Sequence, residues 1–390
     1  CLEDLLDMAP DRYDVTVIGE EPWGNYNRIM LSPVLSGDKT IDDIMLHPHA
    51  WYSDKGIRFI AGDPAVRIDR PRKQVYTEKG EVVDYDRLIL ATGSKPFIPP
   101  IAGADLKGVI SFRDIYDINT MLDYCKTKKN AVVIGGGLLG LEAAYGLKQR
   151  GMNVTVLHLM DRIMERQLDS KASQMLRHSI EQKGISIITE ANTEALVGVD
   201  GHVTQIRLKD GTVLAADLVV FAVGIRPNMA LAQSAGLRCN RGVLVNDTMQ
   251  TFDPSIYAVG ECIEHRSQTF GLVEPLWGQA FICASHLAEH GSLTFKAPTV
   301  PTQLKVSGCD VFSAGNFEPK DDFEDIILND EKRQIYKRII IQKDKVIGAV
   351  LFGDTEDGVW YAELISDQTP ISSIRNKLLF GKDFALKKAG

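Results

Sequence analysis

The most informative part of this sequence is the stretch Ala131-Val132-Val133-Ile134-Gly135-Gly136-Gly137-Leu138-Leu139-Gly140-Leu141-Glu142-Ala143-Ala144. It predicts a buried strand, a glycine turn and a helix start, which is where a Rossmann unit receives a dinucleotide pyrophosphate. Gly135, Gly137 and Gly140 take the three glycine positions of the G-x-G-x-x-G pattern. They allow the tight turn, the approach of backbone to phosphate, and close packing of the helix on the strand. The helix N-terminus adds unpaired N–H groups and a positive dipole.

The flanks of this turn complete a βαβ unit. Residues 141–150 are good helix formers that stop at Gly151, and residues 153–158 form a second apolar strand. The whole unit has the length of roughly 30 residues that a βαβ unit needs. A glycine-rich surface loop without a ligand is the alternative, and these regular flanks weigh against it.

Length and composition limit the class of protein. A chain of 390 residues predicts two or three domains. The net charge of −8 argues against a general nucleic-acid binder, and no run of eighteen apolar residues could span a membrane. We therefore expect a cytoplasmic protein that binds neither nucleic acid nor membrane.

The cysteines limit the chemistry. Six cysteines are scattered without the C-x-x-C spacing of zinc, iron–sulfur or thiol redox sites. The two imidazoles of His47-Pro48-His49 lack a third ligand nearby, so no metal site is predicted. Multi-electron chemistry in this chain then requires a bound organic cofactor.

Other strands also end in small or acidic residues. Residues 14–21 predict a strand ending in Glu20-Glu21, where an acid binds an adenosine ribose or is simply solvated. Residues 85–94 end in the small-residue turn Ala91-Thr92-Gly93, residues 218–224 end on Gly224, and residues 256–261 end in Gly260-Glu261. From residue 302 the pattern changes to alternating strands and a final helix near residues 367–379. We also expect the first strand and glycine loop of the N-terminal Rossmann unit to precede Cys1.

Taken together, these stretches resemble the two-dinucleotide-binding-domain flavoproteins, the pyridine nucleotide–disulfide oxidoreductase superfamily, over nearly the whole chain. The resemblance implies an α/β fold with two Rossmann-like three-layer dinucleotide-binding domains and a small C-terminal α+β domain. It assigns residues 1–110 and 238–298 to an FAD-binding domain, 111–237 to an NAD(P)H-binding domain, and 299–390 to the C-terminal domain.

The same resemblance assigns the site residues. Glu261 stands where the family's second flavin motif usually has Asp, and its longer carboxylate can still accept from a ribityl hydroxyl. Glu142 is expected nearest the nicotinamide as the catalytic residue; an acid favoured by the helix dipole is the alternative. The expected cofactor-binding residues are Glu21, Arg28, Ala91, Thr92, Gly93, Gly135, Gly137, Gly140, His158, Gly224, Gly260 and Glu261.

Within the superfamily, several stretches are similar to the flavoprotein portion of the NAD(P)H-dependent assimilatory nitrite reductase large subunit. They are Glu21-Pro22, Asn25-Tyr26-Asn27-Arg28, Leu31-Ser32-Pro33-Val34-Leu35, Met164-Glu165-Arg166-Gln167-Leu168-Asp169 and Val259-Gly260-Glu261-Cys262. The chain lacks the C-x-x-x-x-C pair of disulfide reductases. It also has Ser36 where flavin NADH oxidases carry a redox cysteine, so both thiol mechanisms are disfavoured.

The resemblance therefore implies that FAD and NAD(P)H serve electron transfer to an iron–sulfur or sirohaem protein or downstream domain. A homodimer is also compatible with it. His158 could serve either ribose, or be a surface histidine, and the resemblance favours NADH. A stand-alone ferredoxin or rubredoxin reductase and a nitrate reductase electron-transfer subunit share these motifs. A non-catalytic assembly or sensor protein that keeps the fold without flavin is the alternative of another class.

Overall fold

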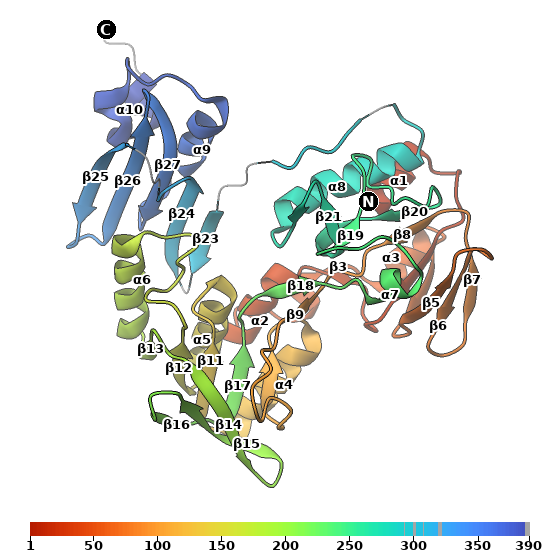
Figure 1. Cartoon of the computed structure of the whole chain (residues 1–390), viewed down its shortest axis with the longest axis horizontal. Coiled ribbons are helices and arrows are strands. Elements are labelled where there is room, and N and C mark those ends of the chain that lie inside the picture. The colour runs from red at the N-terminus through yellow and green to blue at the C-terminus, as the bar shows by residue number, and fades with distance from the viewer. Residues whose placement is uncertain (292, 299–301, 307, 319–321, 387–390) are drawn as a thin grey trace. The chain divides into compact units, whose positions relative to one another are not determined.

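The computed structural model describes residues 1–291, 293–298, 302–306, 308–318 and 322–386 (Figure 1). These residues form two compact units. Unit 1 comprises Cys1–Ile29, Thr40–Phe97 and Gly224–Pro298, and unit 2 comprises Met30–Lys39, Ile98–Val223 and the described residues after Pro298. The predicted α/β class is confirmed, while the predicted domain boundaries stay a prediction.

A five-stranded parallel sheet in the order β10-β17-β11-β12-β13 forms the centre of unit 2. The helix α5 (Leu138–Gln149) connects β11 (Asn130–Ile134) to β12 (Asn153–Leu157), as the sequence predicts. Side chains alternate along β11, and Val132 and Ile134 share a core with the antiparallel sheet β14-β15-β16. The other elements here are α2 (Leu31–Ser36), β10 (Val109–Ser111), α4 (Ile115–Thr127), α6 (Ser170–Gln182), β13 (Ile185–Ile188), β14 (Thr193–Val199), β15 (His202–Leu208), β16 (Val213–Ala215) and β17 (Leu218–Phe221).

The C-terminal part of unit 2 is an antiparallel sheet in the order β23-β24-β27-β26-β25, with α9 (Gly358–Asp367) packed on it (Figure 1). Gly358 lets the helix approach, because a Cβ there would lie 2.5 Å from the Phe312 ring. The remaining elements are β23 (Thr302–Val306), β24 (Cys309–Gly315), β25 (Glu324–Asp330), β26 (Ile335–Gln342), β27 (Lys345–Phe352), η4 (Arg375–Phe380) and α10 (Lys382–Leu386).

The predicted final helix near residues 367–379 is wrong. The helix α9 ends at Asp367, because Gln368 adopts the left-handed conformation with φ of 53° and Pro370 follows. The chain becomes helical again in the short 3-10 segment η4 and then in α10. Residues 367–379 therefore do not form one continuous helix.

Unit 1 contains several small sheets together with helices. The strands β8 (Leu88–Leu90) and β20 (Ile256–Ala258) pair in parallel, and so do β1 (Thr16–Gly19) and β4 (Arg58–Ala61). The other elements are α1 (Leu2–Met8), β2 (Asn25–Tyr26), η1 (Arg28–Met30), η2 (Asp42–Ile44), β3 (Met45–His47), α3 (His49–Asp54), β5 (Ala65–Asp69), β6 (Gln74–Thr77), β7 (Val82–Asp84), β9 (Ser94–Pro96), β18 (Ile225–Pro227), α7 (Ala230–Ser234), β19 (Val243–Leu244), η3 (Gly260–Cys262), β21 (Ile263–His265), β22 (Gln268–Thr269) and α8 (Val273–Leu287).

A carboxyl group at the start of α4 makes the stability of the chain depend on pH. Burial, and then the charge of Asp114, raise the pKa of Asp117 from 3.8 to about 6. The folded state therefore holds this proton more tightly than the unfolded state, so the contribution of Asp117 is favourable below about pH 4 and is lost as pH rises to about 6. We expect Asp117→Asn to raise the free energy of unfolding at pH 7 by about 1–2 kcal/mol.

Urea denaturation at pH 4, 5, 6 and 7 measures this effect. Asp123→Asn is the matched control, since Asp123 lies on the same helix and its side chain is 71% exposed. Equal pH profiles for Asp117→Asn and the parent chain would contradict the prediction.

Candidate functional site

Two of the three loop glycines are required by close backbone contacts. Gly135 has a φ of +128°, and a Cβ there would lie 2.2 Å from the Ala222 carbonyl oxygen. A Cβ at Gly140 would lie 1.9 Å from the Gly135 carbonyl oxygen. The Gly135 contact brings the turn against the residue that follows β17, and the Gly140 contact brings α5 against the end of β11, as the sequence predicts for the third glycine.

Gly137 serves a different purpose. It is the N-cap of α5 with an extended backbone, φ −83° and ψ 179°, and nothing lies within 4 Å of the position of a Cβ. The loop therefore leaves open space next to the first N–H groups of α5, at the carboxyl edge of the parallel sheet. Helix N-termini bind anions because these N–H groups lack partners within the helix, so the loop fits a dinucleotide pyrophosphate.

His158 lies directly after β12 and is buried beside this loop. Its exposed fraction is 9%, so the interpretation as a surface histidine is wrong. The Gly136 N–H donates to Nδ1 at 3.0 Å, and Nε2 lies 3.1 Å from Oε2 of Glu165. A direct contact of His158 with a ribose stays a prediction.

Glu142 lies on α5 and meets the neighbouring helix α2. Its Oε2 accepts from the Ser32 hydroxyl at 2.6 Å, and burial raises the pKa of the Glu142 carboxyl. Arg150 at the end of α5 donates to the carbonyls of Leu35 and Val34 and so fixes the end of α2. Glu142 lies beyond the first turn of α5, where the helix dipole has weakened, so the dipole alone is a poor reason for an acid here. Its role at the nicotinamide stays a prediction.

The predicted flavin turns lie together in unit 1. Because β8 and β20 are parallel neighbours, the turns after them meet at the same edge of the sheet. Ser94 donates to Oε2 of Glu261 at 2.8 Å and thereby links the two turns. Gly260 has a φ of +91° with nothing near the position of a Cβ, and its N–H donates to the buried Gln279 side chain. An open turn beside a carboxylate fits the hydroxyls of a ribityl chain.

Hydrogen bonds connect the turn after β8 to the residues that follow β18. The Thr92 hydroxyl donates to the Asn228 carbonyl at 2.7 Å, and the Asn228 N–H donates to the Gly93 carbonyl. Ala91 is exposed, and Gly224, with a φ of +112°, precedes the strand β18 that pairs with β9. The structure thus connects three of the predicted residues, Thr92, Gly93 and Gly224, through the Asn228 backbone and the paired strands β9 and β18.

Glu21 and Arg28 form one cluster rather than two separate contacts. The Glu21 carboxylate accepts from the Tyr26 hydroxyl at 2.6 Å and pairs with the Arg28 guanidinium. The Arg28 guanidinium also lies over the Tyr26 ring, 4.9 Å from its centroid. A role of either residue at the flavin stays a prediction.

Sequence patterns did not single out four polar side chains of these sites: Ser32, Ser94, Glu165 and Gln279. Ser32 and Glu165 lie in stretches that carry the resemblance to nitrite reductases, and that resemblance could have identified them as site residues. Ser94 and Gln279 lie outside those stretches, and only the folded chain brings them to Glu261 and Gly260.

Thiol and metal chemistry find no support in the described part of the chain. All six cysteines are free, and burial raises the pKa of the Cys283 thiol to about 12 and that of Cys262 as well. A thiol with a raised pKa is a poor nucleophile at neutral pH. Among the described residues no group of three His, Cys, Asp or Glu side chains could hold a metal ion. None of the described helices is long and apolar enough to cross a membrane.

A glycine loop at a helix N-terminus on a parallel sheet, and an open turn beside a carboxylate, are features of flavin-linked NAD(P)H oxidoreductases. The chain belongs to the pyridine nucleotide-disulphide oxidoreductase family, whose model matches residues 4–279. Residues 301–369 match the rubredoxin NAD+ reductase C-terminal domain. The prediction of an FAD-dependent enzyme that uses NAD(P)H is thereby confirmed.

Within this family, the chain is similar to proteins of nitrite and nitrate reduction. Nitrite reductase [NAD(P)H] of Bacillus subtilis (strain 168) is 48% identical over 95% of this chain and 46% of its own length. The assimilatory nitrate reductase electron transfer subunit of the same organism is 41% identical over 97% of this chain and 49% of its own length. The chain thus spans about half the length of these curated relatives, and the predicted resemblance to the flavoprotein portion of nitrite reductase is confirmed.

Solved structures show the same fold over nearly the whole chain. NADH:rubredoxin oxidoreductase from Clostridium acetobutylicum superposes with a TM-score of 0.80 at 26% identity. The match covers 97% of this chain and 96% of that protein. The predicted fold, Rossmann-like domains followed by a C-terminal domain, is confirmed by this similarity.

Proposed function

We propose that this chain is the electron-entry module of nitrite or nitrate assimilation. It oxidises NAD(P)H and delivers electrons through FAD to an iron–sulfur or sirohaem acceptor, which is a partner protein or a downstream domain. The single observation that carries the proposal is the loop at α5, where Gly137 leaves open space beside the helix N-terminus. The similarity to nitrite reductase and to the nitrate reductase subunit supports the choice of pathway.

The residues of the chain bind and orient, and FAD when bound supplies the hydride and single-electron chemistry. Gly135, Gly137 and Gly140 hold the pyrophosphate of NAD(P)H, with Glu142 on the side of the nicotinamide. Around FAD, Thr92, Gly93, Gly260 and Glu261 face the ribityl chain. Glu21 serves the adenosine ribose, and Arg28 lies near the flavin phosphate or ring. Ser94 and Gln279 keep Glu261 and the Gly260 peptide in place.

A thiol relay is not part of this proposal. Ser36 occupies the position of the redox cysteine of flavin NADH oxidases, and its hydroxyl donates to the Pro33 carbonyl and to Asp38. A hydroxyl cannot cycle through a sulfenate or a mixed disulfide. Electrons therefore leave directly for a protein-bound acceptor. A cytoplasmic location fits the six free thiols, and a homodimer stays a prediction.

A rubredoxin or ferredoxin reductase is the second candidate function. It is favoured by the match of residues 301–369 to the rubredoxin reductase C-terminal domain. A protein that keeps the fold without binding flavin is the candidate of another class.

One experiment separates these candidates. Purified chain is mixed with FAD, desalted, and examined for bound flavin absorbance, which NADH is then expected to bleach under anaerobic conditions. Reduced chain is next offered rubredoxin, ferredoxin or the nitrite reductase portion that carries iron–sulfur and sirohaem centres. We expect the fastest transfer to the last of these, before and after alkylation of the thiols. Absence of bound flavin would favour the non-catalytic alternative, and faster reduction of rubredoxin would favour the second candidate.

A further inference from the structure

The segment after β12 places a carboxylate where Rossmann units distinguish NAD from NADP. An acid at the end of the second strand accepts from the ribose 2′-hydroxyl, whereas Arg or Lys there binds a 2′-phosphate. In this chain the position is His158, which follows β12 directly. Both ring nitrogens of His158 have partners inside the protein, Gly136 and Glu165, so a ribose could bond His158 only by replacing one of these partners.

The backbone N–H of Gly136 determines which ring nitrogen of His158 donates and which one accepts. The Gly136 N–H can only donate, so Nδ1 of His158 must be the accepting nitrogen without a proton. The ring proton is therefore assigned to Nε2, which donates to Glu165 at 3.1 Å. His158 thus holds the Glu165 carboxylate one imidazole ring beyond the end of β12.

The backbone before Glu165 is bonded to the same glycine. The Met164 N–H donates to the Gly136 carbonyl at 2.9 Å, so both polar groups of Gly136 are bonded to this segment. Met164 is fully buried in the left-handed conformation with φ of 53°, which is unfavourable for a side chain of this kind. Such conformations persist where the surroundings impose them, and they cluster at ligand sites. The contacts that shape the glycine loop therefore also fix Glu165.

We propose that Glu165 is the side chain that accepts from the ribose 2′-hydroxyl, with His158 as its positioning residue, and that its charge makes the chain select NADH over NADPH. This inference rests on the proposed function, because the dinucleotide must lie on the loop of residues 135–140. The Glu165 side chain is 24% exposed, so it is not fully buried against the protein. A 2′-phosphate would bring further negative charge against it.

The neighbouring cations do not reverse this preference. The Arg162 guanidinium is paired with Glu318 and Asp161. Arg166 lies 3.8 Å from Glu165, but its side chain is 86% exposed, and solvent and salt screen such a charge. Glu165 is therefore a carboxylate whose position at this end of β12 is held by a buried imidazole.

Calorimetric titration of the FAD-loaded chain with NAD+ and NADP+ tests the inference without turnover. We expect the parent chain to bind NAD+ at least about tenfold more tightly than NADP+. Glu165→Gln keeps the size and the contact with His158 but removes the charge, so NAD+ affinity should fall about tenfold while NADP+ affinity does not fall. His158→Asn keeps an acceptor for the Gly136 N–H, but its shorter side chain has no donor at the position of Nε2 that meets Glu165. This variant should give a smaller loss of preference.

Asp161→Asn is the matched control, because it removes the same charge from an exposed acid of the same segment. It should leave the ratio of the two affinities unchanged. A parent chain that prefers NADP+, or an unchanged ratio in Glu165→Gln with an unchanged melting temperature, would overturn the inference. Failure of the proposed function has a different signature, namely normal NAD+ preference without flavin reduction or without transfer to the acceptor.

Discussion

Gly137→Ala is expected to fold as well as the parent chain and to bind NAD(P)H about 10–100-fold more weakly. The backbone of Gly137 is one that alanine adopts without strain, and the added methyl group would meet nothing within 4 Å. Alanine restricts the unfolded chain, which stabilises by about 0.4–1 kcal/mol, and it is a poorer N-cap, which offsets that gain. The methyl group would fill the space through which the phosphates approach the backbone.

Gly140→Ala makes the matching comparison. Its methyl group would lie 1.9 Å from the Gly135 carbonyl oxygen, so the helix must move away from the strand. We expect a loss of about 3 kcal/mol or more in the free energy of unfolding for this variant, against almost none for Gly137→Ala. Urea denaturation measures the first quantity, and fluorescence titration with NADH measures the affinity. Unchanged KM and turnover in Gly137→Ala would refute the assignment of the loop.

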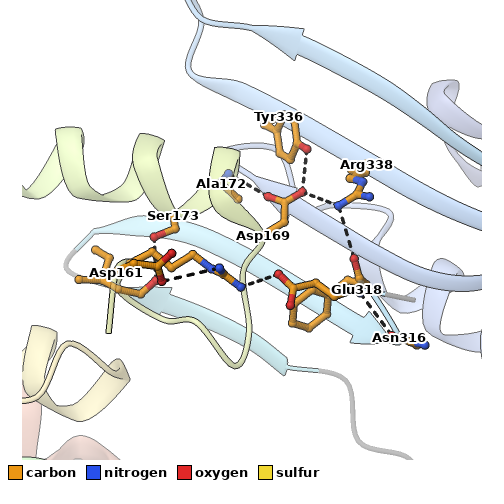
Figure 2. A network of polar contacts seen from close by, with 11 residues as sticks. Asp161, Asp169, Ala172, Ser173, Asn316, Glu318, Tyr336 and Arg338 are labelled. Atoms are coloured by element: carbon orange, nitrogen blue, oxygen red, sulfur yellow. Dashed lines mark hydrogen bonds and ion pairs between the residues drawn. The ribbon is translucent and has the colours of Figure 1, made fainter. Parts of the chain in front are cut away.

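The second large effect is expected at Asp169, whose carboxylate joins two parts of unit 2 (Figure 2). It is 5% exposed and accepts from the Ala172 N–H at 3.0 Å as the N-cap of α6. From β26 it accepts from the Tyr336 hydroxyl at 2.8 Å and from Arg338 at 3.1 Å. Burial and the charge of Asp169 raise the pKa of Tyr336, so this hydroxyl remains a donor at all ordinary pH values.

Asp169→Ala is expected to cost about 3–5 kcal/mol in the free energy of unfolding. The variant loses a helix cap and leaves the Arg338 guanidinium, which is 15% exposed, with Asp325 as its one remaining carboxylate partner among the described residues. Tyr336→Phe removes a single hydrogen bond and should cost about 1–2 kcal/mol. Because both contacts share one carboxylate, the double variant should lose less than the sum of the two.

Lys171→Ala is the control for this region, since Lys171 pairs with Glu331 between the same two parts and the Glu331 side chain is 68% exposed. Such a surface pair contributes about 0–1 kcal/mol. Urea denaturation gives the free energies, and amide hydrogen exchange shows whether α6 and β26 open first. If Asp169→Ala costs no more than Lys171→Ala, the carboxylate does not hold these parts together.

Local pattern was enough to predict the regular parts of the fold. The apolar run of β11, the glycine turn and the helix formers of α5 agree on one local structure. The C-terminal helix was misplaced because the apolar residues near 367–379 are compatible with a helix, while Gln368 and Pro370 end it. The spacing of apolar residues in the sequence does not show whether α9 or the following residues form the longer helix on the C-terminal sheet.

For the candidate site, too, sequence patterns predict some features and not others. Sequence patterns are sufficient to predict the glycine loop and the small-residue turns, because the backbone conformation and the space that a phosphate needs favour glycine at fixed spacing. Which side chains meet at these turns becomes known from the folded chain: Ser94 meets Glu261, Ser32 meets Glu142, and His158 meets Glu165 next to the loop. Such contacts depend on distances between segments that the chain brings together only on folding. Short-range pattern carries no record of those distances.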